Sequence, residues 1–214
     1  AALLAEALPT TAIPEDLPVV VVDDTATALG QVASQFYGQP STKMRLVGIT
    51  GTNGKTTVAT LLYRLFMDLG YTVGLVSTVE HKIGEQVITS THTTPDAITL
   101  NQLLQQMEQA GCEFVFMEVS SHAVDQKRIA GLVFEGGIFT NISHDHLDYH
   151  QTFKAYIHAK QGFFDQLPQA AFALTNIDDR RGQVMIQNTK ARRYTYALRQ
   201  AADFKTKVLE NTLT

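Results

Sequence analysis

The stretch Leu46-Val-Gly-Ile-Thr-Gly51-Thr-Asn-Gly-Lys55-Thr-Thr57 joins an apolar run to a glycine-bearing turn and then to helix-forming residues. A strand, a glycine loop and a helix in this order form the context in which backbone amides and a helix N-terminus bind phosphate. Lys55 would reach the β- and γ-phosphates of a nucleotide, and the Thr56 hydroxyl would bind Mg²⁺. The stretch therefore predicts a phosphate-binding loop.

This loop departs from the usual spacing, G-x-x-x-x-G-K-[ST], because Ile49 stands where the first glycine belongs. The alternative interpretation is an ordinary strand-to-helix turn with a lysine at the start of the helix. A lysine there opposes the helix dipole unless an anion lies nearby. The lysine at the start of the helix therefore favours a shortened phosphate-binding loop over an ordinary turn.

Outward from the loop, strands and helices alternate. Strands are expected at residues 17–22, 46–49, 73–77, 113–119, 136–140, 171–176 and 192–195. Helices are expected at residues 26–37, 55–69, 96–110, 153–164 and 178–186. In the 55–69 helix, the apolar residues spaced for the buried face are Val58, Leu61, Leu62, Leu65 and Leu69. The alternation predicts an α/β fold with a mostly parallel sheet and helices on both faces.

Composition excludes several classes of protein. Of the 214 residues, 44% are hydrophobic and 18% are charged, so the chain can bury a core and is not disordered throughout. The net charge of −4 argues against a nucleic-acid partner, and no apolar run is long enough to cross a membrane. The N-terminus has no basic segment typical of a secretory signal, and Cys112 is the one cysteine. We expect a cytoplasmic protein without an internal disulfide.

Glu118 is the second candidate, in Met117-Glu-Val-Ser-Ser-His122. A carboxylate at the C-terminal end of a buried strand lies at the edge where open α/β sheets bind ligands, so it could hold Mg²⁺. The alternative is a glutamate that only caps or hydrogen-bonds the strand end.

The segment 141–150 concentrates histidine and aspartate and has three interpretations. His144, His146 and Asp148 resemble the start of the H-x-H-x-D-H run of binuclear metallohydrolases, although Tyr149 stands where that run needs histidine. In the second interpretation, His146 alone helps to hold a second Mg²⁺ near the transferred phosphate. The third is a solvated polar loop.

Lys160 lies at the centre of the expected 153–164 helix, near Ala159, Phe163 and Phe164. On its own, such a lysine is expected to lay its stem on the apolar face and extend its ammonium to water.

Together these segments resemble the Mur ligase family. The matching pieces are Gly51-Thr-Asn-Gly-Lys-Thr-Thr57, Thr93-Thr-Pro95, Met117-Glu-Val-Ser-Ser-His122, Gln126-Lys-Arg128, Asn141-Ile142, Asp145-His-Leu-Asp-Tyr-His150, Ala159-Lys160 and Thr175-Asn-Ile-Asp-Asp179. Their order and spacing agree over roughly residues 35–205. The glycine loop is shared with folylpolyglutamate and cyanophycin synthetases, whereas the two histidine-bearing runs are more specific.

The resemblance implies an ATP-dependent amide ligase of peptidoglycan precursor synthesis. ATP would phosphorylate the D-glutamate carboxylate of UDP-N-acetylmuramoyl-L-Ala-D-Glu, and a diamino acid would attack the acyl phosphate. We favour meso-diaminopimelate as that amino acid, with L-lysine as the alternative. A non-enzymatic nucleotide-binding module of the same fold and a metallohydrolase are further alternatives.

The resemblance also implies residue roles. The ATP contacts would be Gly51, Thr52, Asn53, Gly54, Lys55, Thr56, Thr57 and, on the adenine side, Asn176. The first Mg²⁺ would be held by Thr56 and Glu118, and the second by His146 and a carbamylated Lys160. Lys55, His146 and Lys160 would be the catalytic residues. The substrate contacts would be Thr93, Thr94, Ser120, Gln126 and Arg128.

Such ligases have three domains, and the resemblance implies which of them this chain holds. Residues 1–40 are expected to be the end of a UDP-binding domain with its linker, and residues 41–214 an incomplete central ATP-binding domain. The C-terminal domain that brings the amino acid is expected to be absent, so this chain alone is expected to be inactive. We expect the ligase to be a monomer.

Overall fold

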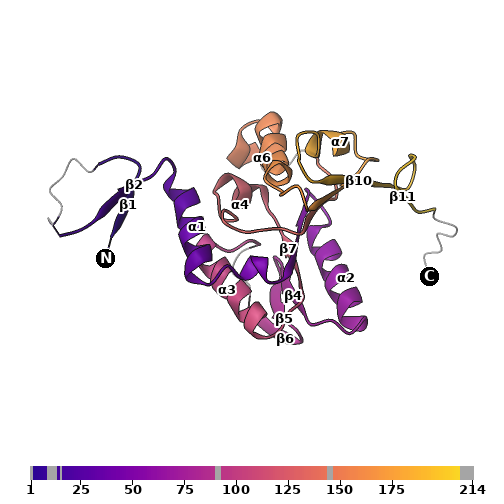
Figure 1. The fold of residues 1–214 in the computed structure, drawn as a ribbon. Helices are drawn as coiled ribbons and strands as arrows, with labels where there is room; N and C mark the ends of the chain where they lie inside the picture. Colours follow the sequence, from indigo (N-terminus) through magenta and orange to yellow (C-terminus); the bar gives the residue numbers. More distant parts are fainter. Residues whose placement is uncertain (1, 9–13, 15, 90–92, 144–146, 208–214) are drawn as a thin grey trace.

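A large sheet lies at the centre of the molecule (Figure 1), and the described candidate residues lie on its strands or on the segments that follow them. The computed structural model describes residues 2–8, 14, 16–89, 93–143 and 147–207. Within them the sheet has nine strands in the order β11-β10-β9-β8-β3-β7-β4-β5-β6. Their bounds are β3 Arg45–Thr50, β4 Val73–Val76, β5 Glu80–Ile83, β6 Gln86–Thr89, β7 Phe114–Glu118, β8 Gly136–Phe139, β9 Phe172–Asn176, β10 Arg192–Ala197 and β11 Phe204–Lys205.

The strand pairing confirms a mostly parallel α/β sheet. β3 pairs in parallel with β7 on one side and β8 on the other, while only the β4–β5 and β5–β6 pairs of this sheet are antiparallel. After β3 the chain moves past β7 to β4, and after β7 it moves back past β3 to β8. The loops after β3, β7 and β8 therefore meet at one edge, where open α/β sheets bind ligands.

Helices cover both faces of the sheet, as the sequence predicts (Figure 1). α2 (Lys55–Asp68) packs on one face against β7, β4 and β3. The other face carries α3 (Ala97–Gln109), α4 (Ser121–Asp125), α6 (Phe153–Asp165) and α7 (Gly182–Met185). The short helices η1 (Pro40–Thr42) and α5 (Leu147–His150) complete the described elements of this domain.

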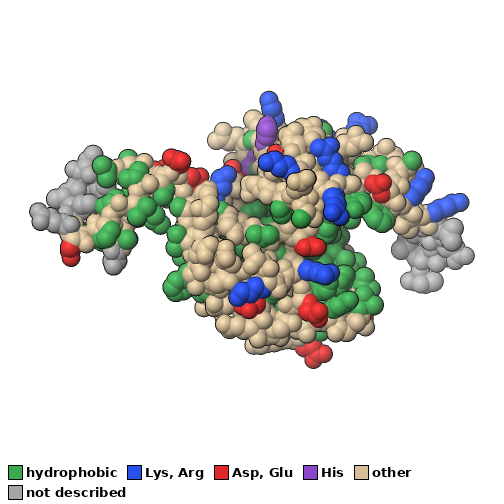
Figure 2. Space-filling view, in the orientation of Figure 1, with side chains coloured by type: hydrophobic (Ala, Val, Ile, Leu, Met, Phe, Trp, Pro, Cys, Tyr) green, Lys and Arg blue, Asp and Glu red, His purple; other side chains and the backbone are tan. Residues whose placement is uncertain are grey.

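The predicted buried face of α2 is partly wrong. Leu61, Leu65 and Leu69 are 59%, 52% and 63% exposed, and Figure 2 shows hydrophobic side chains gathered over α2. Ala59 and Tyr63 are the buried residues of this helix. Two apolar stripes fit a 3.6-residue period here, and the small Ala59 permits the closer approach to the sheet.

The helix predicted at residues 178–186 is also shorter than expected, because α7 spans only Gly182–Met185. Asp178 and Asp179 use their carboxylates outside a helix. Asp178 accepts hydrogen bonds from the backbone N–H groups of residues 198, 199 and 200. Asp179 accepts from the N–H groups of Ile142 and Arg181. These side-chain bonds to the backbone favour a turn over a helix.

The N-terminal segment stands apart from the large sheet (Figure 1). β1 (Leu3–Ala5) and β2 (Val19–Val21) form a separate parallel pair, and α1 (Thr25–Phe36) packs on α3. A Cβ added at Gly30 would lie 2.5 Å from the carbonyl oxygen of Ala130, so α1 lies close to the segment after α4. None of the described helices is both long and apolar enough to cross a membrane.

Candidate active site

The glycine loop after β3 is fixed to the segment after β8. Thr52 N–H donates to the Asn141 carbonyl over 2.8 Å, and Asn53 N–H donates to Asn141 Oδ1 over 3.0 Å. A Cβ at Gly51 would lie 2.0 Å from Thr140 Oγ1, so this close approach requires glycine. The loop is therefore held in shape by the backbone carbonyl and the side-chain amide oxygen of Asn141, just after the neighbouring strand β8.

Lys55 begins α2 and folds back over the loop. Its Nζ donates to the carbonyl oxygens of Gly51 and Thr52 over 3.0 and 2.9 Å. Within the described chain no side chain caps the α2 N-terminus, so its first N–H groups face the loop. Amides and an ammonium around one turn are the donors that a nucleotide phosphate requires. Thr57 lies exposed in the same first turn.

Glu118 faces the loop from the end of β7, and its side chain is fully buried. Its Oε1 accepts from Thr56 Oγ1 and from Thr78 N–H, each over 2.8 Å. Its Oε2 accepts from Thr78 Oγ1 over 3.2 Å. A hydroxyl and a carboxylate in contact beside the glycine loop are hard oxygen donors that fit Mg²⁺. Thr78 was not predicted as a site residue, because nothing in the residues after β4 marks it.

Lys160 is not a surface lysine, because its side chain is only 1% exposed. Its Nζ donates to the Gly51 carbonyl over 2.9 Å and to Thr50 Oγ1 over 3.5 Å, and lies 4.8 Å from the centre of the Tyr156 ring. The Tyr156 hydroxyl in turn lies 3.0 Å from Thr52 Oγ1. The expected extension to water is therefore wrong, and α6 places this lysine directly beneath the glycine loop.

The candidate substrate residues gather around the end of β7. Thr94 Oγ1 donates to the Glu118 carbonyl over 2.9 Å, and Arg128 donates to the Thr94 carbonyl over 2.8 Å. The Ser120 hydroxyl caps α4 by accepting from Ala123 N–H. Thr93 accepts a hydrogen bond of 3.1 Å from the Thr78 hydroxyl.

One hollow of about 530 Å³ brings the loop and most of these residues together. It is lined by Thr52, Asn53, Gly54, Lys55, Thr56, Thr78, Thr93, Thr94, Glu118, Ser120, His122 and Arg128. Gln126 does not line this hollow but bonds to Arg128. His122 was not predicted as a contact, although the quoted run ends on it.

Asn176 belongs to an adjoining hollow of about 540 Å³ between the ends of β8, β9 and β10. Its Nδ2 donates to the Thr140 carbonyl, and its Oδ1 accepts from Asp178 N–H. Asn141 lines the same hollow and also holds the glycine loop. Tyr196 lines it too, and burial raises the pKa of this phenol. The hollow is therefore connected to the glycine loop through Asn141.

Part of the predicted site cannot be placed. His144 and His146 lie outside the described residues, and the side chain of Asp148 is not described. Among the residues that are described, no three His, Cys, Asp or Glu side chains form a metal-binding group. The second Mg²⁺ site and the metallohydrolase site therefore stay predictions.

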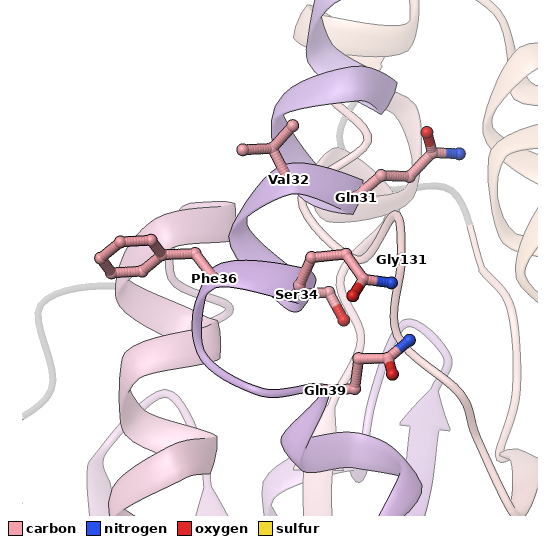
Figure 3. Close-up of a pocket in the computed structure, with 7 residues that line it drawn as sticks. Gln31, Val32, Ser34, Phe36, Gln39 and Gly131 are labelled. Atoms are coloured by element: carbon pink, nitrogen blue, oxygen red, sulfur yellow. The ribbon is translucent and has the colours of Figure 1, made fainter.

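A further hollow of about 760 Å³ lies away from the loop, beside α1. Figure 3 shows residues of α1, with Gln39 and Gly131, around it; among the described residues, no charged side chain and no predicted site residue lines it. Its lining offers no chemistry of the kind found beside the glycine loop.

The fold and the site place the chain in a class, the α/β domains that carry a glycine loop of the phosphate-binding type after a central strand. The family described as Mur ligase middle domain matches residues 49–214. The chain therefore belongs to the Mur ligase family, as its motifs indicate.

Curated relatives agree with this assignment. The chain is 59% identical over 212 residues to a UDP-N-acetylmuramoyl-L-alanyl-D-glutamate--2,6-diaminopimelate ligase of Cytophaga hutchinsonii, covering 99% of this chain and 44% of the relative. It is 40% identical over 198 residues to the ligase of the same name from Bacillus cereus, covering 90% and 40%. The chain thus spans less than half the length of these relatives.

Solved structures share the fold. A structure of a protein with the same ligase name has a TM-score of 0.83 at 28% identity, covering 95% of this chain and 42% of its own. A MurF ligase from Thermotoga maritima in complex with ADP has a TM-score of 0.61 at 17% identity, covering 94% and 42%.

Proposed function

We propose that this chain is the ATP-binding part of a longer ligase that joins a diamino acid to UDP-N-acetylmuramoyl-L-Ala-D-Glu. One observation carries the proposal: a single hollow is lined by the phosphate-loop residues Lys55 and Thr56 together with Glu118, Thr94 and Arg128. A ligase needs ATP and the carboxylate that it phosphorylates within reach of each other, and this hollow supplies donors for both.

The reaction gathers negative charge, and the residues around the loop would offset it. The γ-phosphoryl group of ATP passes to the D-glutamate carboxylate, ADP leaves, and the amine of the diamino acid then displaces phosphate to form the amide. Lys55 and the loop amides would hold the phosphates, while Arg128 would hold an anionic group of the second substrate.

Mg²⁺ fits the oxygen donors of Thr56 and Glu118, which already lie 2.8 Å apart. When bound, the ion would neutralise phosphate charge and align the transfer. His146 and Lys160 are proposed for a second Mg²⁺. A carbamate on Lys160 would give that site an anionic oxygen ligand in place of an ammonium, and the burial of Lys160 beneath the loop supports this proposal.

The domain organisation is also a proposal. Residues 1–40 would end a UDP-binding domain, and residues 41–214 would form most of the central domain. We also propose that the complete ligase is a monomer. Because ATP and UDP-linked precursors are cytoplasmic metabolites, we propose a cytoplasmic location.

The amino acid is proposed to be meso-diaminopimelate, because both curated relatives described above are named as 2,6-diaminopimelate ligases. The decisive experiment uses the complete ligase. ADP release is measured with ATP, Mg²⁺ and UDP-N-acetylmuramoyl-L-Ala-D-Glu, with either meso-diaminopimelate or L-lysine added. ADP release only with L-lysine would contradict meso-diaminopimelate as the added amino acid. ATP binding without turnover under all these conditions would favour a non-enzymatic module, and Zn²⁺-dependent hydrolysis would favour a metallohydrolase.

Arg128→Ala should weaken the binding of the UDP-linked substrate far more than the binding of ATP. Loss of one charge-assisted contact should raise the KM for the UDP-dipeptide on the order of tenfold or more, while the KM for ATP changes less than about twofold. Steady-state kinetics on the complete ligase would measure both constants. The adjacent Lys127→Ala is the control, because Lys127 does not line this hollow. An equal rise in both KM values would remove the substrate role of Arg128.

A further inference from the structure

The segment after β7 is joined to α5 through Tyr149, a residue that the proposed mechanism does not use. The Tyr149 hydroxyl donates to Asp125 Oδ2 over 2.7 Å and accepts from Gln126 Nε2 over 3.2 Å. Its ring packs 4.2 Å from the ring of His122, measured between centroids. Tyr149 therefore touches α4 at His122 and Asp125, and the residue that follows it, Gln126.

Gln126 connects Tyr149 to Arg128. Its Oε1 accepts from Arg128 Nε over 2.9 Å and from the second guanidinium nitrogen over 2.6 Å. Arg128 places its remaining nitrogen on the Thr94 carbonyl. Both ends of the Gln126 amide are thus engaged, one by tyrosine and the other by arginine.

The donors and acceptors of these hydrogen bonds allow one orientation of the Gln126 amide. An ionised Asp125 can only accept, so it turns the Tyr149 hydroxyl hydrogen toward itself. The hydroxyl oxygen is then an acceptor, which selects the NH₂ end of Gln126 and leaves the carbonyl end for Arg128. A flipped amide would set its N–H donors against those of the guanidinium. The same bond raises the pKa of Tyr149, so the hydroxyl keeps its proton.

We propose that Tyr149 is a positioning residue, which orients the Arg128 guanidinium for the anionic substrate by locking the Gln126 amide in one orientation. This inference rests on the proposed function, because it takes Arg128 to hold the UDP-linked substrate.

Tyr149→Phe in the complete ligase removes the hydroxyl and keeps the ring that packs on His122. The KM for UDP-N-acetylmuramoyl-L-Ala-D-Glu should rise roughly tenfold, while kcat and the KM for ATP change less than about twofold. Tyr194→Phe is the matched control, because Tyr194 is also 37% exposed and lies on β10 outside this hollow. It should leave all three constants unchanged.

The double variant separates positioning from a general structural effect. If Tyr149 acts through Arg128, adding Tyr149→Phe to Arg128→Ala should raise the substrate KM less than about twofold further. An undiminished tenfold effect in that background, or an unchanged KM in Tyr149→Phe alone, would overturn the inference and leave the proposed function standing. If Arg128→Ala itself leaves the substrate KM unchanged, the proposed role of Arg128 is wrong and the inference falls with it.

Discussion

Lys55→Ala should remove measurable ATP binding from this chain and leave its fold intact. The ammonium contacts the carbonyl oxygens of Gly51 and Thr52, so it stands among the loop amides where phosphate charge would lie. Losing a charge-assisted contact to phosphate in a partly buried site should weaken binding on the order of a hundredfold. Isothermal titration with ATP and Mg²⁺ would measure the affinity.

The control for Lys55→Ala is Arg64→Ala, which removes an exposed cation from the same helix. It should change neither the affinity nor the melting temperature. Lys55→Ala should also melt within a few degrees of the unchanged chain, because this side chain contributes little to the apolar core. Unchanged affinity in Lys55→Ala would show that the glycine loop is not a phosphate site.

The strands and helices that build this site follow from local sequence, and the exceptions have physical causes. The β5–β6 hairpin was not predicted, because Glu80-His-Lys-Ile83 and Gln86-Val-Ile-Thr89 mix polar and apolar residues without a clear alternation. The two residues between them, Gly84 and Glu85, were the available signal for a tight turn. Pairing with β4 stabilises a hairpin whose own sequence is weakly patterned.

Within the site, sequence identified the side chains with distinctive chemistry and missed those that act through position. Lys55, Thr56 and Glu118 were predicted, and the structure brings them into one hollow. Thr78 was not predicted, because one of its hydrogen bonds to Glu118 comes from the backbone N–H, which every residue except proline has. The orientation of Gln126 depends on Tyr149, which lies 23 positions away in the sequence and meets it only in the fold.

The burial of Lys160 shows most clearly what local sequence does not predict. A lysine beside Phe163 and Phe164 fits an exposed helix flank as well as a buried one. Only the sheet topology, which lays α6 under the end of β3, decides between the two. The structure gives this ammonium a carbonyl and a hydroxyl as partners next to the proposed phosphate site.

Lys160→Ala in the complete ligase should lower kcat by about a thousandfold or more, the scale expected when a ligand of a catalytic metal is lost. Short carboxylic acids such as formate or acetate should restore part of the activity, because the deleted side chain leaves space beside Gly51 for a carboxylate. Lys154→Ala is the control, since Lys154 lies exposed on the same helix and should have no effect.

Lys160→Arg distinguishes a carbamate from a permanent cation. Carbamylation requires a neutral lysine nitrogen to attack the carbon of CO₂; an N–C bond forms, one C–O electron pair moves to oxygen, and a proton leaves the nitrogen. The product keeps one N–H, which can still donate to the Gly51 carbonyl. Arginine keeps its charge and cannot undergo this step, so Lys160→Arg should be as inactive as Lys160→Ala. Substantial activity in Lys160→Arg would instead assign Lys160 the role of a fixed positive charge, and near-normal turnover in Lys160→Ala would remove it from the catalytic site.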